Sequence, residues 1–156
     1  FGPGVEASMF GGERAIIPAL EGKSAPFIGN PDLPHTYSYV PDVGRGLVIL
    51  GTDDRALGKV WHIPAPQTVT TREFVEKVFA ETGHPPRVSI APRFALRVMG
   101  VFNPVMRELI EMLYEFDAPF VMDHSRFVET FGDIATPLDQ AIAETVAWYR
   151  QHRATA

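Results

Sequence analysis

The segment "HTYSYVPDVGRGLVIL" (residues 35–50) changes its hydrophobic period at one proline, and this change decides the fold class. Its first six residues alternate, which predicts a short strand with His35, Tyr37 and Tyr39 on one face. After Pro41 the apolar residues recur at helical spacing instead. A strand that leads directly into a helix is typical of an α/β protein.

The helix predicted after this strand begins at Pro41-Asp42, where a proline and a short acidic side chain suit the first turn. Asp42 is therefore interpreted as a helix cap rather than as a ligand. The apolar stripe of the helix consists of Val43, Leu47 and Leu50. Gly44 and Gly46 each cost about 1 kcal/mol relative to alanine inside a helix. Their presence predicts that the helix backbone closely approaches a neighbour.

Further strands and helices are predicted on both sides of this segment. Short apolar runs bounded by glycine or proline predict strands over 24–29, 58–64 and 87–92. Thr70 and Glu73 have the spacing of a capping box, and Gly83 is a natural terminator of the helix that they open. Other helices are predicted over 13–21, 103–116, 123–132 and from 136 onward. The last of these carries an apolar stripe of Leu138, Ile142, Val146 and Tyr149.

Length and composition predict one globular α/β domain over residues 1–156. The chain has no cysteine, which excludes disulfides and cysteine-bound zinc and agrees with a cytoplasmic location. The formal net charge is −5 and no block of Lys or Arg occurs, so nucleic acid is not an expected partner. No apolar run approaches the roughly 20 residues that span a bilayer, so no membrane contact is expected.

No motif for a common catalytic or metal site is present. "LEGKS" (20–24) resembles the end of a phosphate-binding loop, but Ile17 stands where the first glycine of that loop belongs. The five histidines lack the spacing of metal ligands, so no metal site is predicted. Neither a Gly-x-Ser-x-Gly elbow nor a Gly-x-Gly-x-x-Gly dinucleotide loop occurs.

Five segments in order carry a resemblance to one enzyme family. "FGPG" (1–4) is similar to a Tyr-Gly-Pro-Gly that follows a parallel strand, and residues 18–50 are similar to a helix, a strand and an Arg-x-Tyr-x-x-Val-Asp-Asp-x-Ala stretch. Residues 58–83 are similar to a strand and a threonine-capped helix. "DHSRFVETFG" (123–132) and "TPLDQAIAETVAWYR" (136–150) are similar to two closing helices. The family is that of the extended short-chain dehydrogenases/reductases, also called NAD-dependent epimerases/dehydratases.

The resemblance covers only the carboxyl-terminal portion of that family and implies a specific fold. The chain is expected to be the substrate-binding part of an extended Rossmann-fold enzyme, with short strands, about five or six helices and an incomplete Rossmann sheet. Its dinucleotide-binding domain and the Tyr-x-x-x-Lys catalytic pair are expected upstream of Phe1. NAD or NADP is therefore expected in the parent protein, without tight binding to this chain alone. No catalytic residue is expected in the chain itself.

The resemblance also implies which residues face the cofactor and the substrate. Three residues would border the nicotinamide: Phe1, Gly2 and Pro3. Three others would lie on a strand beside the substrate: Pro26, Phe27 and Ile28. His35 takes the place of an arginine that holds a diphosphate, and a neutral histidine is a weaker anchor for that group. Tyr37 and Tyr39 are either pocket wall or ordinary strand tyrosines.

Several functions remain open at this point. The parent is expected to be an epimerase, a dehydratase or a reductase that acts on a sugar nucleotide or on a small ketone or alcohol. The apolar stretch 94–120 is a candidate lining for a less polar substrate. The alternatives are a non-catalytic relative that senses a dinucleotide or ligand, and an independent α/β interaction module. A truncated piece would expose the apolar surface that faces the parallel sheet and could form a homo-oligomer through it.

Overall fold

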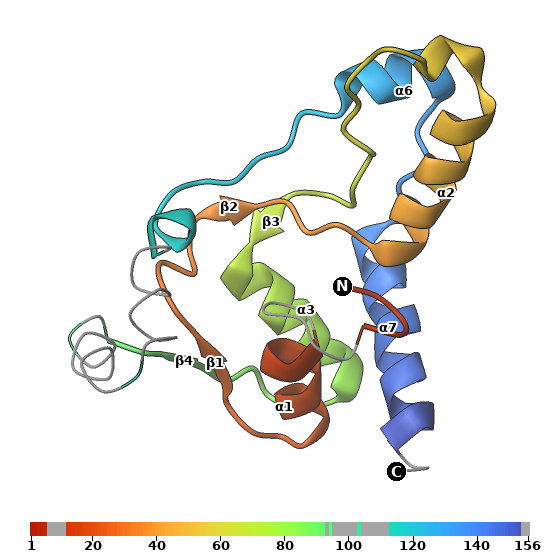
Figure 1. The fold of residues 1–156 in the computed structure, drawn as a ribbon. Helices are drawn as coiled ribbons and strands as arrows, with labels where there is room; N and C mark the ends of the chain where they lie inside the picture. Colours follow the sequence, from red (N-terminus) through yellow and green to blue (C-terminus); the bar gives the residue numbers. More distant parts are fainter. Residues whose placement is uncertain (6–11, 93, 95–102, 104–112, 154–156) are drawn as a thin grey trace.

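The described part of the chain is an α/β arrangement with five α-helices and two small sheets (Figure 1). The computed structural model describes residues 1–5, 12–92, 94, 103 and 113–153. The helix predicted over 103–116 falls mostly outside these residues, and its end is a 3₁₀ turn, η3 (Leu113–Phe116). The α/β class predicted from the sequence is confirmed.

The two sheets each contain two short strands. β1 (Ala25–Phe27) pairs in parallel with β4 (Val88–Ile90), which confirms the strands predicted over 24–29 and 87–92. β2 (Pro34–His35) pairs antiparallel with β3 (Val69–Thr70). Both strands of the second sheet are two residues long. The sheet therefore joins two segments of the chain but is too small to form a layer of the fold.

The core lies between three helices and the first sheet. α3 (Thr71–Thr82) packs against α7 (Leu138–Arg153) and against α1 (Ile17–Leu20). The capping box at Thr70 and the left-handed Gly83 are both present, so the predicted ends of α3 are confirmed. The buried faces are also as predicted, with Phe74, Val75, Val78 and Phe79 on α3 and Leu138, Ile142, Val146 and Tyr149 on α7.

The predicted helix over 13–21 is confirmed in place but not in type. It begins as a π-helical turn, η1 (Gly12–Ile16), and continues as α1. Pro18 lies in the first turn of α1, where its missing N–H costs no intrahelical hydrogen bond. Pro18 therefore lies at a helical position that tolerates proline.

The strand predicted over 35–40 is wrong beyond His35. Thr36 is buried as well as Tyr37, because its hydroxyl contacts Thr68 at 2.8 Å and accepts the Met122 N–H at 3.1 Å. Further along, the carbonyl of Ser38 and the N–H of Val40 bond to the backbone of Phe1 at 2.8 and 2.9 Å. Successive residues thus pair with different segments, and the alternation does not persist.

The helix α2 (Val40–Thr52) is present, but its predicted apolar stripe is confirmed only in part, since Val43 and Leu50 are half-buried and Leu47 is exposed. Leu47 is 60% exposed, and the fully buried positions are Asp42 and Gly46. A Cβ on Gly46 would meet Ile63 at 2.5 Å, so the predicted close approach is confirmed there. A Cβ on Gly44 would meet nothing within 4 Å among the described residues.

Asp42 does not cap its own helix, contrary to the prediction. Its carboxylate accepts the N–H of Thr136 at 2.8 Å and the hydroxyl of Thr136 at 2.7 Å, and it pairs with Arg45. The side chain is fully buried, and the bonds connect the start of α2 to the residues that open α7. Asp42 therefore joins two helices that are far apart in the sequence.

The strand predicted over 58–64 is also wrong. The segment between η2 (Asp54–Ala56) and β3 is not paired, and none of the described backbone–backbone bonds involves residues 59–64. Its sequence has the composition of a strand, but a strand requires a neighbouring strand to bond with. The described residues supply none at this place.

Two helices near the carboxyl end are as predicted. α6 (Ser125–Phe131) begins after Asp123, whose carboxylate accepts the Ser125 N–H at 2.9 Å, and it ends at Gly132. α7 follows as the longest described helix. No helix in the parts of the chain that the structure describes combines the length and apolarity needed to cross a bilayer.

Replacing Asp42 with alanine is expected to lower the free energy of unfolding by about 2–3 kcal/mol. The change leaves the buried N–H and hydroxyl of Thr136 without their acceptor and removes the Arg45 ion pair. Urea denaturation of Asp42→Ala beside Asp54→Ala, an exposed carboxylate, measures the effect. Equal stability of the two variants would contradict this role.

Candidate functional site

A pocket of about 440 Å³ is lined from β2 and from the η3 turn. Among the described residues, His35 lines it from β2. The other lining residues come from the segment that follows: Tyr114, Glu115, Phe116, Ala118, Pro119 and Phe120. Most of these are apolar or aromatic. The described lining is therefore mainly aromatic and includes one imidazole.

Backbone bonds fix this segment against β2 and β1. The N–H of Phe120 donates to the carbonyl of Pro34 at 2.9 Å, and the N–H of Thr36 donates to the carbonyl of Phe120 at 2.8 Å. At the other end, the carbonyl of Phe116 accepts the Asn30 N–H at 2.9 Å. Gly29, with φ +78°, permits this contact because a Cβ there would overlap Phe116. The pocket wall is held at both ends.

His35 is half-buried and contacts two aromatic rings among the described residues. Its ring centroid lies 5.1 Å from that of Tyr37 and 5.1 Å from that of Phe120. Burial lowers the pKa of His35 below its ordinary value, and the nearby Glu115 carboxylate opposes the change only in part. The imidazole is therefore neutral at neutral pH. The described lining therefore contains an imidazole that carries no charge at neutral pH.

The two tyrosines predicted beside His35 lie deeper in the structure. Tyr37 stacks on Phe74 at 4.5 Å, and its hydroxyl bonds to Thr71 at 2.7 Å. Tyr39 donates to Glu144 at 2.5 Å. Burial raises the pKa of Tyr37 to about 12 and also raises that of Tyr39, which the Glu144 carboxylate raises further. Neither phenol is acidified, as a tyrosine that relays a proton must be.

The three predicted residues of β1 and its exit differ in exposure. Phe27 is buried in the core, Ile28 is half-buried and Pro26 is exposed. The parallel pairing with β4 turns Phe27 inward, where it joins the cluster around α3 and α7. Of the three, Pro26 presents the most surface to solvent.

The first three residues form an edge rather than a cradle for a dinucleotide. The ring of Phe1 packs on Tyr39 at 5.4 Å and on Phe74 at 5.1 Å, and its backbone is bonded to the segment 38–40. Gly2 is buried with φ +147°, and a Cβ there would touch Val40. Pro3 is half-buried. The described residues contain no glycine-rich turn between a strand and a helix, so they do not by themselves fit the phosphates of NAD.

The other described histidines do not assemble a metal centre. His62 Nδ1 bonds to the carbonyl of Asp123 at 2.7 Å, and His152 stacks on Trp148 at 4.2 Å. His124 Nδ1 is buried without a hydrogen-bond partner. Within the described ranges, no group of three or more His, Asp or Glu side chains could hold a metal ion.

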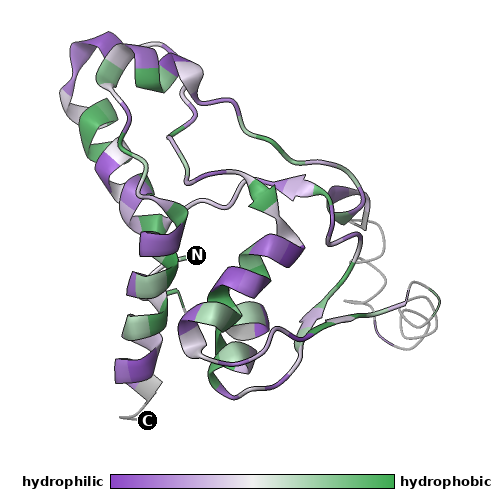
Figure 2. Ribbon diagram, turned by 180° about the vertical axis from the view of Figure 1, so that it is seen from behind, coloured by the Kyte–Doolittle hydropathy of each residue, from purple (hydrophilic) through white to green (hydrophobic). Residues whose placement is uncertain are grey.

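The helix α2 also has an exposed apolar face, which the predicted stripe of Val43, Leu47 and Leu50 did not identify. Five residues on one side of the helix form this α2 face: Val40, Gly44, Leu47, Val48 and Gly51. Its three large members are between 46% and 65% exposed, and both glycines meet open space. Figure 2 shows hydrophobic residues recurring along α2, which projects from the rest of the molecule. The face is a ridge of apolar side chains with two shallow gaps for close backbone approach.

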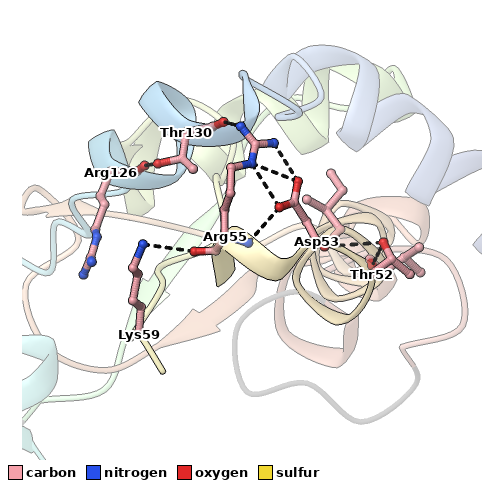
Figure 3. Close-up of polar contacts among 8 residues, drawn as sticks. Thr52, Asp53, Arg55, Lys59, Arg126 and Thr130 are labelled. Atoms are coloured by element: carbon pink, nitrogen blue, oxygen red, sulfur yellow. Dashed lines mark hydrogen bonds and ion pairs between the residues drawn. The ribbon is translucent and has the colours of Figure 1, made fainter. Parts of the chain in front are cut away.

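The segment 59–64 lies between α2 and α6 and is held in place by side chains. Arg55 bonds bidentately to Asp53 and donates to the carbonyl of Thr130 at 2.9 Å, while Lys59 donates to the carbonyl of Arg55 at 3.1 Å (Figure 3). The guanidinium of Arg126 lies 4.7 Å from the Trp61 ring centre. Val60 nevertheless remains 79% exposed. The segment is positioned but its backbone is not paired.

The pKa of His35 is expected to lie below about 6.5 and to rise in Phe120→Ala, which removes one covering ring. The unfolded state then binds a proton at higher pH than the folded state does. The free energy of unfolding should therefore increase as pH rises through the ordinary histidine range, and less so in the variant.

Histidine NMR titration measures this pKa. Val121→Ala, an exposed neighbour outside the described lining, is the control and should leave it unchanged. A wild-type His35 that titrates at or above its ordinary value would contradict the enclosed geometry.

Comparisons with known proteins give likeness of fold without likeness of sequence. No protein-family model matches the chain, and a search of curated proteins returns no match. Solved structures do match. UDP-glucuronic acid 4-epimerase from Bacillus cereus, in complex with NAD, superposes with a TM-score of 0.69 and 16% identity, over 97% of this chain and 42% of that one.

Two dehydratases match in the same way. dTDP-glucose 4,6-dehydratase from Bacillus anthracis, also in complex with NAD, gives a TM-score of 0.64 at 17% identity, over 89% of this chain and 38% of that one. DesIV from Streptomyces venezuelae gives 0.63 at 19% identity, over 90% of this chain and 38% of that one. The chain thus spans less than half the length of each. It has the fold of the carboxyl-terminal portion of the extended short-chain dehydrogenases/reductases.

Proposed function

We propose that the chain is the substrate-binding portion of an NAD(P)-dependent epimerase, dehydratase or reductase. One observation carries the proposal: nearly the whole chain superposes on less than half of an NAD-bound epimerase, and its own described residues lack a dinucleotide loop. Residues 1–156 act as a single substrate-binding domain in this proposal. A dinucleotide-binding domain supplies the rest.

The α2 face is the docking site for that domain. A helix that exposes Leu47 and Val48 gains free energy by burying them, at about 25 cal/mol per Å² of apolar area. Gly44 and Gly51 allow a second backbone to approach closely. The occupant we assign is the dinucleotide-binding domain, which would place an apolar surface of its own on this helix face.

The segment 59–64 supports the same occupant. None of its described backbone groups bonds to another backbone group, although the Val60 carbonyl accepts from Arg126, so the segment is suited to pairing with a further strand; α2 already packs on it through Gly46 and Ile63. A helix lying on an unpaired strand is one half of a βα layer. The edge strand of the docked sheet completes the other half.

The roles of the site residues follow from this arrangement. The nicotinamide supplies hydride transfer and is held by the docking domain, with Phe1, Gly2 and Pro3 forming its border on this side. The proton relay belongs to the docking domain, because Tyr37 and Tyr39 are buried, bonded and not acidified. The substrate occupies the pocket at His35, with Pro26 and Ile28 beside it and Tyr37 behind the imidazole.

The full-length protein is expected to bind NAD or NADP at one site per chain and to reduce or oxidise the cofactor with a substrate. Isothermal titration of both dinucleotides measures binding. The nicotinamide absorbance, followed across a panel of sugar nucleotides, ketones and alcohols, measures turnover. A full-length protein that binds neither dinucleotide would refute the proposal and favour an independent interaction module.

Leu47→Asp is expected to weaken the docking in the full-length protein. The change places a charge where an apolar side chain would be buried, which costs about 2–3 kcal/mol or more of domain association. The measurement is the affinity for the dinucleotide and the thermal unfolding profile, which should separate into two transitions.

Leu57→Asp is the matched control, since Leu57 is as exposed as Leu47 and lies outside the α2 face. If Leu47→Asp changes neither readout but dissociates a dimer, the face binds a second copy of the chain instead.

A further inference from the structure

We propose that Lys59 and Arg126 bind a carboxylate of the dinucleotide-binding domain, carried by an aspartate or glutamate beside the strand that pairs with the segment 59–64. The inference rests on the proposed function and names the chemistry of the partner surface. The α2 face supplies the apolar part of this interface, and the two cations supply its charged end. Their pairing fixes the register of the docked strand.

Both cations lie against one aromatic ring. The guanidinium of Arg126 is 4.7 Å and the ammonium of Lys59 is 5.8 Å from the centre of the Trp61 ring. Figure 3 shows Arg126 extending from α6 and Lys59 from the residues that follow η2, so separate elements contribute the two charges. The indole is itself fixed, because its Nε1–H donates to the Ala56 carbonyl at 3.0 Å. The two positive charges are therefore held beside the same ring.

These charges have no counter-charge in the described part of the chain. None of its ion pairs involves Lys59 or Arg126, whereas the neighbouring Arg55 is paired with Asp53 at 2.6 Å. Two like charges beside one ring repel each other, and an anion between them would replace the repulsion by attraction. The chain as a whole carries a formal net charge of −5, so this is a local surplus of positive charge on an acidic protein. A carboxylate of another domain is attracted to it.

Most hydrogen-bond donors of the two cations are also unused among the described residues. Arg126 Nη1 donates to the Val60 carbonyl at 3.4 Å, and Lys59 Nζ donates to the Arg55 carbonyl at 3.1 Å. The guanidinium and the ammonium have several further N–H donors. The bond to Val60 places the guanidinium at the unpaired backbone of the segment 59–64, where it can reach a side chain of a neighbouring strand. A planar carboxylate matches the fork of the guanidinium.

The register of the docked strand is what these charges determine. A strand that slips by one residue turns all its side chains to the opposite face. Burial of the apolar α2 face opposes such a slip only weakly, because the hydrophobic effect has no direction. A charge pair at a fixed point does oppose it, since electrostatic complementarity sets register and specificity more than affinity.

The position of the two cations favours a protein carboxylate over a phosphate of the cofactor. Phe1, at the border assigned to the nicotinamide, bonds to the segment 38–40 at the start of α2, whereas the two cations lie near the other end of that helix (Figure 1). A helix of 13 residues is about 20 Å long. The length of α2 therefore separates the cations from the nicotinamide border.

Amide hydrogen exchange in the full-length protein, without added dinucleotide, tests the inference at about 20 mM and about 500 mM NaCl. The amides of Val60 and Trp61 are expected to lose about tenfold in protection as the salt concentration rises. Lys59→Gln/Arg126→Gln is expected to show about tenfold lower protection at low salt and little further change at high salt, because the charges that salt screens are already absent.

Lys23→Gln/Arg87→Gln is the matched control, since it removes the same two charges from exposed positions before β1 and β4. It should behave as the wild type does at Val60 and Trp61. The amide of Val78, a buried residue of α3, reports folding and should stay protected in every variant.

Wild-type protection that does not depend on salt would overturn the inference and leave the docking in place, as would a Lys59→Gln/Arg126→Gln variant that matches the control. Protection that appears only after NADP is added would also overturn it, because the anion would then be a phosphate of the cofactor. If Val60 and Trp61 exchange as in an unstructured chain even at low salt, while Val78 stays protected, the docking itself is refuted and with it the proposed function.

Discussion

The contact between Gly46 and Ile63 lays α2 directly on the extended segment 59–64, and much of the architecture depends on it. Because Gly46 has no side chain, the Ile63 side chain packs directly on the helix backbone, while the described residues leave the opposite side of α2 exposed. The bonds of Arg55 to Asp53 and to the carbonyl of Thr130 connect the residues before the segment to α6. The contact between Arg126 and Trp61 holds the segment itself against α6. The result is a helix packed on an unpaired segment, which in our proposal pairs with the sheet of the docked domain.

Three of the other described helices and the first sheet bury their apolar faces against one another. The first sheet and the helices α1, α3 and α7 enclose a continuous apolar core, and the buried carboxylate of Asp42 bonds to Thr136, far along the chain, and to Arg45, one turn along α2. The His35 pocket stands on this firm part, fixed by backbone bonds to β2. The molecule thus has two parts. One part encloses the apolar core and carries the pocket, and the other contains α2, whose exposed face we assign as the docking site of a dinucleotide-binding domain.

The helices α3 and α7 were predicted well from the sequence because the signals that specify them are local. The capping box of Thr70, the left-handed Gly83 and the stripe of α7 all depend on neighbouring residues in the chain. The burial predicted for Leu47 and the strand predicted over 58–64 are wrong for one reason: their hydrophobic pattern suits neighbours that the described residues do not provide. The role of Asp42 was predicted wrongly, as a helix cap, because its partner Thr136 lies 94 positions away. His35 was singled out from the sequence by the arginine it replaces, whereas the rings around it come from a segment whose conformation no local pattern specifies.

Amide hydrogen exchange in the full-length protein tests the central claim most directly. If the segment 59–64 completes a sheet with a docked dinucleotide-binding domain, the amides of Val60 and Trp61 will be protected as strongly as those of β1 and β4. Exchange at these two amides as fast as in an unstructured chain, with β1 and β4 still protected, would contradict the account.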